Sequence, residues 1–429
     1  MLSMSIRCKS VDKMKMKKIL HLFLIIILVA TMSSCEQKNE LKNGIWRGEL
    51  AVSGGRKAPF LFEVEKHGID SATFTLLNGE ERVKLTGVTF HGDTLIVPIV
   101  AFDTEIRGFV TNDRIEGKFI KNYIQDDPGV PFTAVYGVEE RFEPASQPST
   151  RQIDGKWEVL FLSENGDTTR NVGIFKTDGG IVTGSIMTNS GDLRFLEGAY
   201  TDNGVQLSAF SGPSPYLIDL VFTDDTLFEG TFYTTNGITQ LSGLKNDAAA
   251  LADAYSLAGL KEGYETLSFT LPDLEGNRVS LSDERYMGKV VIVSILGSWC
   301  PNCHDEMAFL APWYDANRDR GVEIIGIAFE RKDDEAYAQK TISRLKERHN
   351  IKYPILFGGA VGKENVAGVL PELDNFSGYP TTIFIDKQGK VRRIHTGFTG
   401  PATGLFYEEF IEEFNALIDS LLADTLLAE

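Results

Sequence analysis

Uninterrupted apolar runs predict buried strands in the C-terminal part of the chain. Val290–Leu296 is a run of apolar, mostly β-branched residues without polar alternation, which is typical of a strand buried on both faces. Residues 322–329 form a second run of this kind. After them, residues 333–349 are amphipathic, and large apolar residues recur at helical spacing from Phe406 to Leu421. We therefore expect two helices, the second packed on the sheet.

The N-terminal half has a different pattern, in which short stretches of β-forming residues alternate with turn residues. Two all-β modules are predicted, at 41–142 and 153–245, with a Pro- and Ser-containing linker between them. The opening Asn43-Gly44-Ile45-Trp46 is matched by Asp154-Gly155-Lys156-Trp157, and further matched stretches keep an offset within two residues of 111. We therefore predict a duplicated unit, each copy an antiparallel meander curled into a small barrel or sandwich with a filled core.

A helical linker is expected between these modules and the C-terminal domain. Residues 246–261 are rich in Ala and Leu, and Asn246 is a suitable cap for their first turn. The C-terminal α/β domain then spans 262–429, which makes the predicted fold class multidomain. The net charge is −17, without a basic cluster outside the extreme N-terminus. This balance argues against nucleic acid and anionic membrane surfaces as partners.

The N-terminus has the pattern of a secretory leader. A basic stretch precedes the apolar run 19–30, which is too short to span a membrane comfortably and indicates a signal peptide over residues 1–34. Met32-Ser33-Ser34-Cys35 is similar to a bacterial lipobox, although Met is a loose match at its first position. This resemblance implies that Cys35 is the lipidated first residue of the mature chain. The alternative is a plain secretory signal with an incidental cysteine.

A cysteine pair directly after the first apolar run carries the candidate chemistry. The run ends at Gly297, and Trp299-Cys300-Pro301-Asn302-Cys303 follows. Proline suits the first turn of a helix, so Cys300 would lie at a helix N-terminus, where free N–H groups stabilise a thiolate. Cys303, one turn further, would be its shielded partner. Because these are the free thiols that remain after processing, redox chemistry is favoured over a disulfide framework.

This motif, together with Tyr379-Pro380-Thr381-Thr382, resembles the membrane-anchored thioredoxin-like thiol–disulfide oxidoreductases of the ResA/TlpA group. The likeness covers roughly residues 262–424 and implies a thioredoxin-like fold, which the order of predicted strands and helices suits. It also implies that Pro380 is a cis-proline facing the dithiol. The substrate-binding residues implied by the resemblance are Trp299, Pro301, Tyr379, Pro380 and Thr381.

The resemblance also implies the catalytic roles. Cys300 would attack a partner disulfide, and Cys303 would resolve the mixed disulfide. Thioredoxins carry a buried acid six residues before the first cysteine, where this chain has Ser294. Glu306, on the same helix face as Cys303, is implied instead as the proton acceptor; the alternative is a solvated surface carboxylate. His304, four residues after Cys300, is expected to face solvent; the alternative is that its protonated ring tunes the Cys300 thiolate.

Three other chemistries are compatible with a cysteine pair. Cys300-Pro301-Asn302-Cys303-His304 matches the haem-attachment signature. Haem attachment needs no strand directly before the motif, whereas this chain has one, and that context favours thiol–disulfide exchange. Zinc needs four ligands, and the mature chain has no second cysteine pair. A peroxiredoxin would carry threonine where this chain has Gly297. We therefore expect neither a cofactor nor a metal.

The sequence thus predicts a lipid-anchored thiol–disulfide oxidoreductase of the bacterial cell envelope, facing the periplasm and acting as a reductant. Its expected partners are disulfide-bearing envelope proteins and a membrane dithiol relay as electron donor, and the lipid would attach it to a membrane. The rival interpretation is a binding lipoprotein, whose β modules capture a ligand or partner while the redox domain is accessory.

Overall fold

A computed structural model describes residues 40–68, 71–91, 94–143, 145–146, 151–163, 165–202 and 204–423. The predicted signal peptide and Cys35 lie outside these residues. Among the residues described, no helix combines the length and the apolar character needed to cross a membrane.

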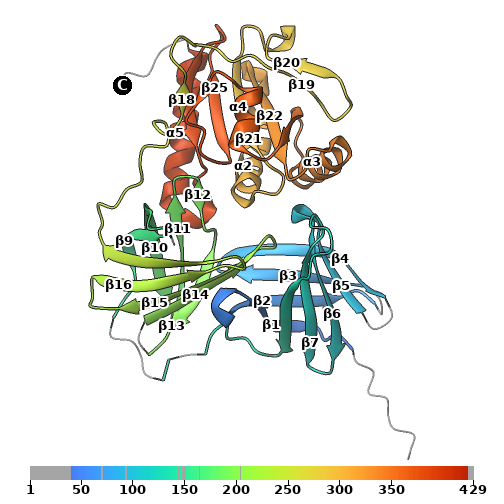
Figure 1. Cartoon of the computed structure of the whole chain (residues 1–429), viewed down its shortest axis with the longest axis vertical. Helices are drawn as coiled ribbons and strands as arrows, with labels where there is room; N and C mark the ends of the chain where they lie inside the picture. The colour runs from blue at the N-terminus through green and yellow to red at the C-terminus, as the bar shows by residue number, and fades with distance from the viewer. Residues whose placement is uncertain are drawn as a thin grey trace, which may run out of the picture. The chain divides into compact units, whose positions relative to one another are not determined.

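The first β module is a closed antiparallel barrel (Figure 1), in which sequential strands pair and β8 returns to β1. Large aromatic side chains, among them Trp46, Phe60, Phe62 and Phe119, are fully buried, so this core is filled. The strands are β1 (Gly44–Ala51), β2 (Lys57–Lys66), β3 (Ser71–Asn78), β4 (Glu81–His91), β5 (Thr94–Ile99), β6 (Thr104–Thr111), β7 (Arg114–Lys121) and β8 (Val130–Tyr136).

The second β module is built in the same way. Its sheet has the order β10-β9-β17-β16-β15-β14-β13-β11-β12, and a further pairing of β10 with β11 closes it. The strands are β9 (Gly155–Leu162), β10 (Thr168–Asp178), β11 (Ile181–Thr188), β12 (Gly191–Asp192), β13 (Leu196–Tyr200), β14 (Gly204–Phe210), β15 (Pro215–Phe222), β16 (Leu227–Tyr233) and β17 (Ile238–Lys245). The short β12 pairs only with the end of β11, as a hairpin.

Matching contacts in the two barrels support the predicted duplication. In each copy a fully buried tryptophan, Trp46 or Trp157, donates from Nε1 to the carbonyl oxygen four residues before it, at 3.0 and 2.7 Å. In each copy the residue three positions before the tryptophan, Asn43 or Asp154, accepts a hydrogen bond from a backbone N–H 23 residues later, at 2.7 Å in both. The two copies therefore anchor their first strand by the same pair of bonds.

The C-terminal domain is a five-stranded sheet covered on both faces (Figure 1). The sheet order is β23-β22-β21-β25-β26, in which β23, β22 and β21 are parallel to one another and β25 is antiparallel to both of its neighbours, β21 and β26. The strands are β21 (Val290–Leu296), β22 (Val322–Glu330), β23 (Ile355–Ala360), β25 (Thr381–Ile385) and β26 (Val391–Thr396), and the helices are α2 (Pro301–Asn317), α3 (Glu335–His349), α4 (Lys363–Val369) and α5 (Leu405–Leu422).

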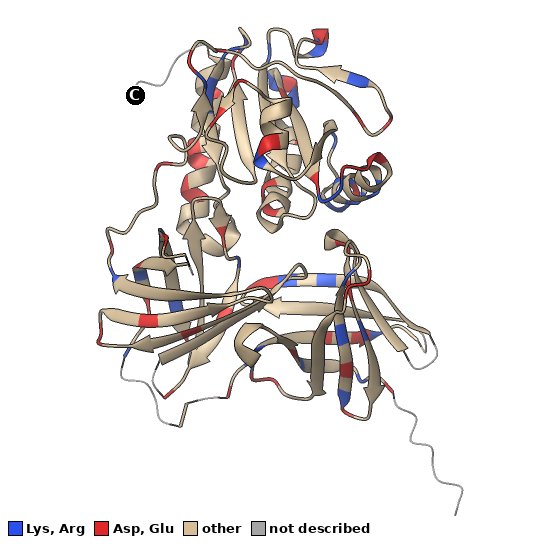
Figure 2. Cartoon of the chain, viewed as in Figure 1, with Lys and Arg blue, Asp and Glu red and all other residues tan. Residues whose placement is uncertain are grey.

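The central strand β21 is buried along its whole length, as its apolar run predicts. Its residues point alternately into two cores: Ile292 faces α2, α3 and α5, whereas Val293 faces α4 and the hairpin of β19 (Thr270–Pro272) and β20 (Arg278–Ser280). Helix α5 buries one side through Phe410 and Phe414, while its acidic residues lie along the outside (Figure 2). Strand β23 and helix α4 were not predicted.

The expected helix at 246–261 is wrong. The stretch forms turns and then the two-residue strand β18 (Gly259–Leu260), which pairs with β24 (Leu373–Asp374). Asn246 does accept from the N–H of Ala248, but the turn stops there. A short helix is stable only when an apolar face packs on a partner, and most side chains of this stretch are exposed or half-buried, so helix propensity alone does not decide its structure.

Candidate functional site

The cysteine pair lies where a buried strand passes into a helix. Cys300 is the N-cap of α2, Pro301 is its first residue, and the Cys303 N–H points at the Cys300 sulfur at 3.2 Å. The two cysteines form a disulfide with their Cα atoms 5.2 Å apart. Cys300 is 5% exposed and Cys303 is fully enclosed, so Cys303 is the more shielded of the two, as expected. The helix start thus directs free N–H groups at the outer sulfur.

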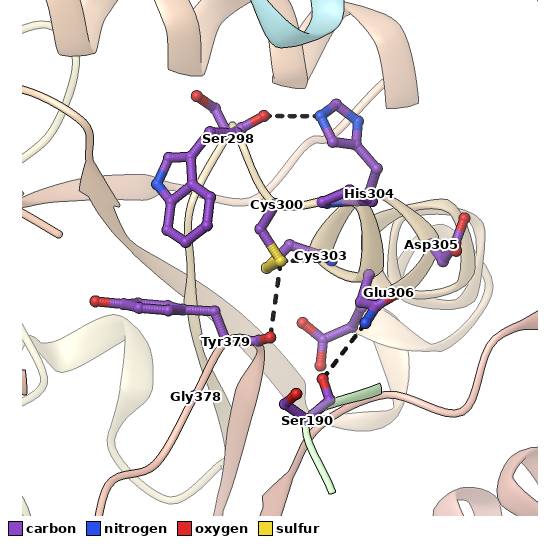
Figure 3. Close-up of a disulfide and its surroundings, with 12 residues drawn as sticks. Ser190, Ser298, Cys300, Cys303, His304, Asp305, Glu306, Gly378 and Tyr379 are labelled. Atoms are coloured by element: carbon purple, nitrogen blue, oxygen red, sulfur yellow. Dashed lines mark hydrogen bonds between the residues drawn. A yellow bond between two sulfur atoms is a disulfide. The ribbon is translucent and has the colours of Figure 1, made fainter. Parts of the chain in front are cut away.

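The cis-proline loop faces this disulfide. The Tyr379–Pro380 peptide is cis, as the family resemblance implied. The Cys300 sulfur lies 3.7 Å from the Tyr379 carbonyl oxygen (Figure 3), and the Trp299 ring meets the Tyr379 ring edge-on at 5.4 Å between centroids. Of the predicted substrate-binding residues, Trp299, Pro301 and Tyr379 are half-buried, whereas Pro380 and Thr381 are buried. The Thr381 hydroxyl donates to the Gly378 carbonyl at 2.8 Å and stabilises the loop from within the domain.

Glu306 lies inside the domain beneath the disulfide (Figure 3). It is 3% exposed, so the surface-carboxylate alternative is wrong. Its Oε2 accepts from the Ser294 hydroxyl at 2.6 Å, and its Oε1 accepts from the Thr382 hydroxyl. Burial raises the pKa of the Glu306 carboxyl to about 7, against the opposing effect of the two hydroxyl donors. The group is therefore able to gain and lose a proton near neutral pH.

His304 is buried, and the expectation that it faces solvent is wrong. Its Nε2 lies 2.8 Å from the Ser298 carbonyl oxygen and its Nδ1 lies 2.9 Å from His349 Nε2, while the ring of Phe102 from the first barrel meets it edge-on. Burial lowers the pKa of His349 to about 4 and that of His304 well below its usual value. Both rings are then neutral at pH 7. Because a carbonyl can only accept, His304 donates from Nε2 and accepts at Nδ1.

Both ring nitrogens of His304 have protein partners, and the sulfurs of Cys300 and Cys303 are joined to each other. In the part of the chain that the structure describes, no group of three or more His, Cys, Asp or Glu side chains is arranged to hold a metal ion.

A buried acid that the sequence analysis missed supports the loop before the cysteines. Glu330 ends β22 and is fully enclosed. It accepts from the Ser298 N–H at 3.0 Å, from the Ser298 hydroxyl at 2.6 Å and from the Thr341 hydroxyl at 3.1 Å. Burial raises its pKa. A lone acid directly after a continuous apolar run was the available signal, and it points to a loop-anchoring role.

Comparisons with known proteins place the similarity over the C-terminal domain. The model of the AhpC/TSA family matches residues 263–394. The thiol-disulfide oxidoreductase ResA of Halalkalibacterium halodurans is 29% identical over 158 residues, which cover 37% of this chain and 77% of that protein. ResA of Geobacillus thermodenitrificans is 33% identical over 129 residues, which cover 30% of this chain and 66%, just under two thirds, of that protein.

Solved structures match the same region. The thioredoxin domain of a thiol-disulfide oxidoreductase from Bacteroides vulgatus is 26% identical with a TM-score of 0.27, covering 36% of this chain and 99% of that one. A thioredoxin-family thiol:disulfide interchange protein from Chlorobium tepidum is 21% identical with a TM-score of 0.29, and the match covers 38% of this chain and 99% of that one. The C-terminal part of this chain is a thioredoxin-like domain, and its sequence relatives among thiol–disulfide oxidoreductases support an oxidoreductase role.

Proposed function

We propose that this protein is a lipid-anchored thiol–disulfide oxidoreductase of the cell envelope that faces the periplasm and reduces disulfides through Cys300 and Cys303. The observation that carries the proposal is the cysteine pair itself, with Cys300 at the cap of α2 opposite the cis-proline loop and Cys303 enclosed behind it. The lipid anchor rests on the sequence around Cys35 alone, which lies outside the described residues.

The exchange proceeds in two displacement steps. The Cys300 thiolate attacks one sulfur of the substrate disulfide, so that the substrate S–S bond breaks, a mixed disulfide forms and the other substrate sulfur leaves as a thiolate. The Cys303 thiol then passes its proton to the Glu306 carboxylate and attacks the Cys300 sulfur. The mixed disulfide breaks, and the second substrate thiolate leaves. Two electrons have moved from the enzyme dithiol to the substrate, and Cys300 and Cys303 are joined.

The proposed partners follow from this chemistry. The substrates are disulfide-bearing envelope proteins. The joined cysteines must be reduced again by an external dithiol, for which a membrane-embedded dithiol relay is the proposed electron donor. Thiol–disulfide exchange itself requires neither metal nor cofactor. Glu306 is well suited to its proposed role because burial places its pKa near the working pH of a general base.

The reduction potential of the Cys300–Cys303 couple tests the direction of the reaction. Equilibration in thiol–disulfide buffers, followed by alkylation and mass analysis, measures it. We expect a value near that of thioredoxin, about −270 mV, for a reductant. A value near that of the oxidant DsbA, about −120 mV, would contradict the proposed direction.

A further inference from the structure

A turn of the second barrel lies against the start of α2, between the two cysteines. The β11–β12 turn, taken as residues 189–191 with Gly191 as the first residue of β12, brings the Ser190 carbonyl oxygen within 3.5 Å of the Asn302 amide nitrogen, which donates to it (Figure 3). Gly191 packs so closely that a Cβ atom there would overlap the Asn302 side chain. Both segments belong to one compact unit of the chain, Lys42–Glu429. The turn therefore contacts the residue between the two cysteines.

The same turn contacts the two other loops beside the disulfide. A Cβ atom on Gly378, in the cis-proline loop, would lie 3.2 Å from the Ser190 Cβ. A Cβ atom on Gly397, whose N–H donates to the Pro380 carbonyl at 2.8 Å, would lie 2.8 Å from the Asn189 carbonyl oxygen. Glycine at both positions lets the turn approach the backbone of these loops. The β11–β12 turn thus contacts the start of α2, the cis-proline loop and the loop that follows β26.

Buried charges hold the turn in this place. The Asp192 carboxylate is 5% exposed and accepts from the Gly400 N–H at 2.8 Å. The Arg194 guanidinium donates to the Pro301 carbonyl at 3.1 Å and pairs with Asp305, on the first turns of α2. Displacing the turn would break these contacts with the C-terminal domain in a poorly solvated place, although Asp192 would keep Ser185 and Arg194 would keep Glu81 as partners.

The position of the turn restricts what can approach Cys300. In-line attack requires that a substrate sulfur reach Cys300, which is only 5% exposed. A folded protein that docks on the start of α2 and on the cis-proline loop would also meet the turn, which contacts both. We propose that the β11–β12 turn is a specificity-determining element, which admits small disulfides and narrow extended segments to Cys300 and excludes folded protein surfaces. The proposal rests on the proposed function and narrows its substrate class to disulfides in unfolded or flexible segments.

The test weakens the contact between the β11–β12 turn and the C-terminal domain by substitution, and measures how fast reagents of different size reach Cys300. Gly191→Leu introduces a side chain that overlaps the Asn302 side chain, so that the turn or that side chain must move. Gly180→Leu is the matched control, because Gly180 lies in another turn of the same barrel, also has a positive φ (89°), and has nothing within 4 Å of its Cβ position. Asp192→Ala removes the acceptor for Gly400, and Asp192→Asn keeps an acceptor oxygen as its control.

Two readouts separate the proposal from the proposed function. The first is alkylation of reduced Cys300 by N-ethylmaleimide and by maleimide-labelled lysozyme, which requires no turnover. We expect Gly191→Leu and Asp192→Ala to raise the rate of Cys300 alkylation by maleimide-labelled lysozyme roughly tenfold or more, and to change the rate with N-ethylmaleimide by no more than about twofold. Both control variants should react at the rates of the wild type. The second is kcat/KM for oxidised glutathione and for insulin, where the same selective gain is expected for insulin.

The outcomes are distinct. Equal rates with maleimide-labelled lysozyme in the wild type, Gly191→Leu and Asp192→Ala would overturn the role of the turn. Failure of the wild type to reduce either disulfide, with alkylation still selective, would instead overturn the proposed function and leave the access filter supported. A gain that appears equally in Gly180→Leu would assign it to general loosening of the barrel and would also overturn the proposal.

Discussion

Replacing Glu306 with glutamine changes one proton-binding group in an enclosed place. The wild-type carboxyl accepts from the Ser294 and Thr382 hydroxyls. A glutamine has nearly the same shape, and a hydroxyl can accept from its amide N–H as well as donate to its oxygen. We therefore expect Glu306→Gln to fold normally, so that its effects report on the proton.

The first expected effect is on the resolving step. Because burial raises the pKa of Glu306 to about 7, the carboxylate fraction of the wild type should rise with pH through neutrality, and the rate of mixed-disulfide resolution should follow it. Loss of a general base slows a step by roughly 10²–10⁴-fold. Stopped-flow measurement of disulfide reduction from pH 6 to 8 should show the slower rate and no inflection near pH 7 in the variant. Alkylation of Cys300 by iodoacetamide should be nearly unchanged.

The second expected effect is on stability. Between pH 4.5 and about 7 the folded wild type retains a proton that the unfolded chain has lost. Its free energy of unfolding should therefore fall as pH rises through this window, by roughly 3 kcal/mol for a shift of this size. Glu306→Gln lacks this decrease. In urea unfolding, the free energy of unfolding of the variant relative to the wild type should therefore rise by roughly 3 kcal/mol between pH 4.5 and 7. Equal turnover from pH 6 to 8 together with equal pH dependence of unfolding would refute the reasoning.

Three further substitutions test other parts of the molecule. Cys35→Ser should release the protein from membranes with dithiol chemistry intact, and a variant that still sediments with membranes after a salt wash would exclude the lipid anchor. Cys303→Ser should accumulate mixed disulfides on non-reducing gels that vanish with reductant; if Cys300→Ser accumulates them instead, the roles are reversed. Glu330→Ala leaves the Ser298 N–H and hydroxyl without their acceptor, so chemical denaturation should show a loss of about 1–3 kcal/mol, and no loss would exclude the anchoring role.

Local patterns sufficed where the structure is decided by neighbouring residues. The apolar run of β21 and the proline after Cys300 predicted the strand, the helix start and the depth of the two cysteines. The repeat of Gly-x-Trp predicted two similar β modules, because the motif carries its own anchoring bonds within a few residues. Pro380 was assigned from resemblance, and the structure confirms the cis peptide.

The parts that could not be predicted depend on distant partners. His304 is buried because Phe102, two hundred residues earlier, and His349 cover it. Residues 189–191 were recognisable as a hairpin turn, but nothing local shows that the turn lies on loops more than a hundred residues away. The helix predicted at 246–261 does not form, because its composition favours a helix but the stretch lacks a surface on which to pack. Local sequence does not reveal whether such a surface is present.

Arg194 also bears on how the chain unfolds. This one buried guanidinium, in the second barrel, pairs with Glu81 of the first barrel and with Asp305 of the thioredoxin-like domain. A buried charge that loses its partner is strongly destabilising, by about 3–5 kcal/mol. If either barrel or the thioredoxin-like domain unfolds, this cluster loses one of its charged members, and the folded parts that remain are destabilised. Denaturation should therefore show the three parts unfolding in a coupled rather than an independent way.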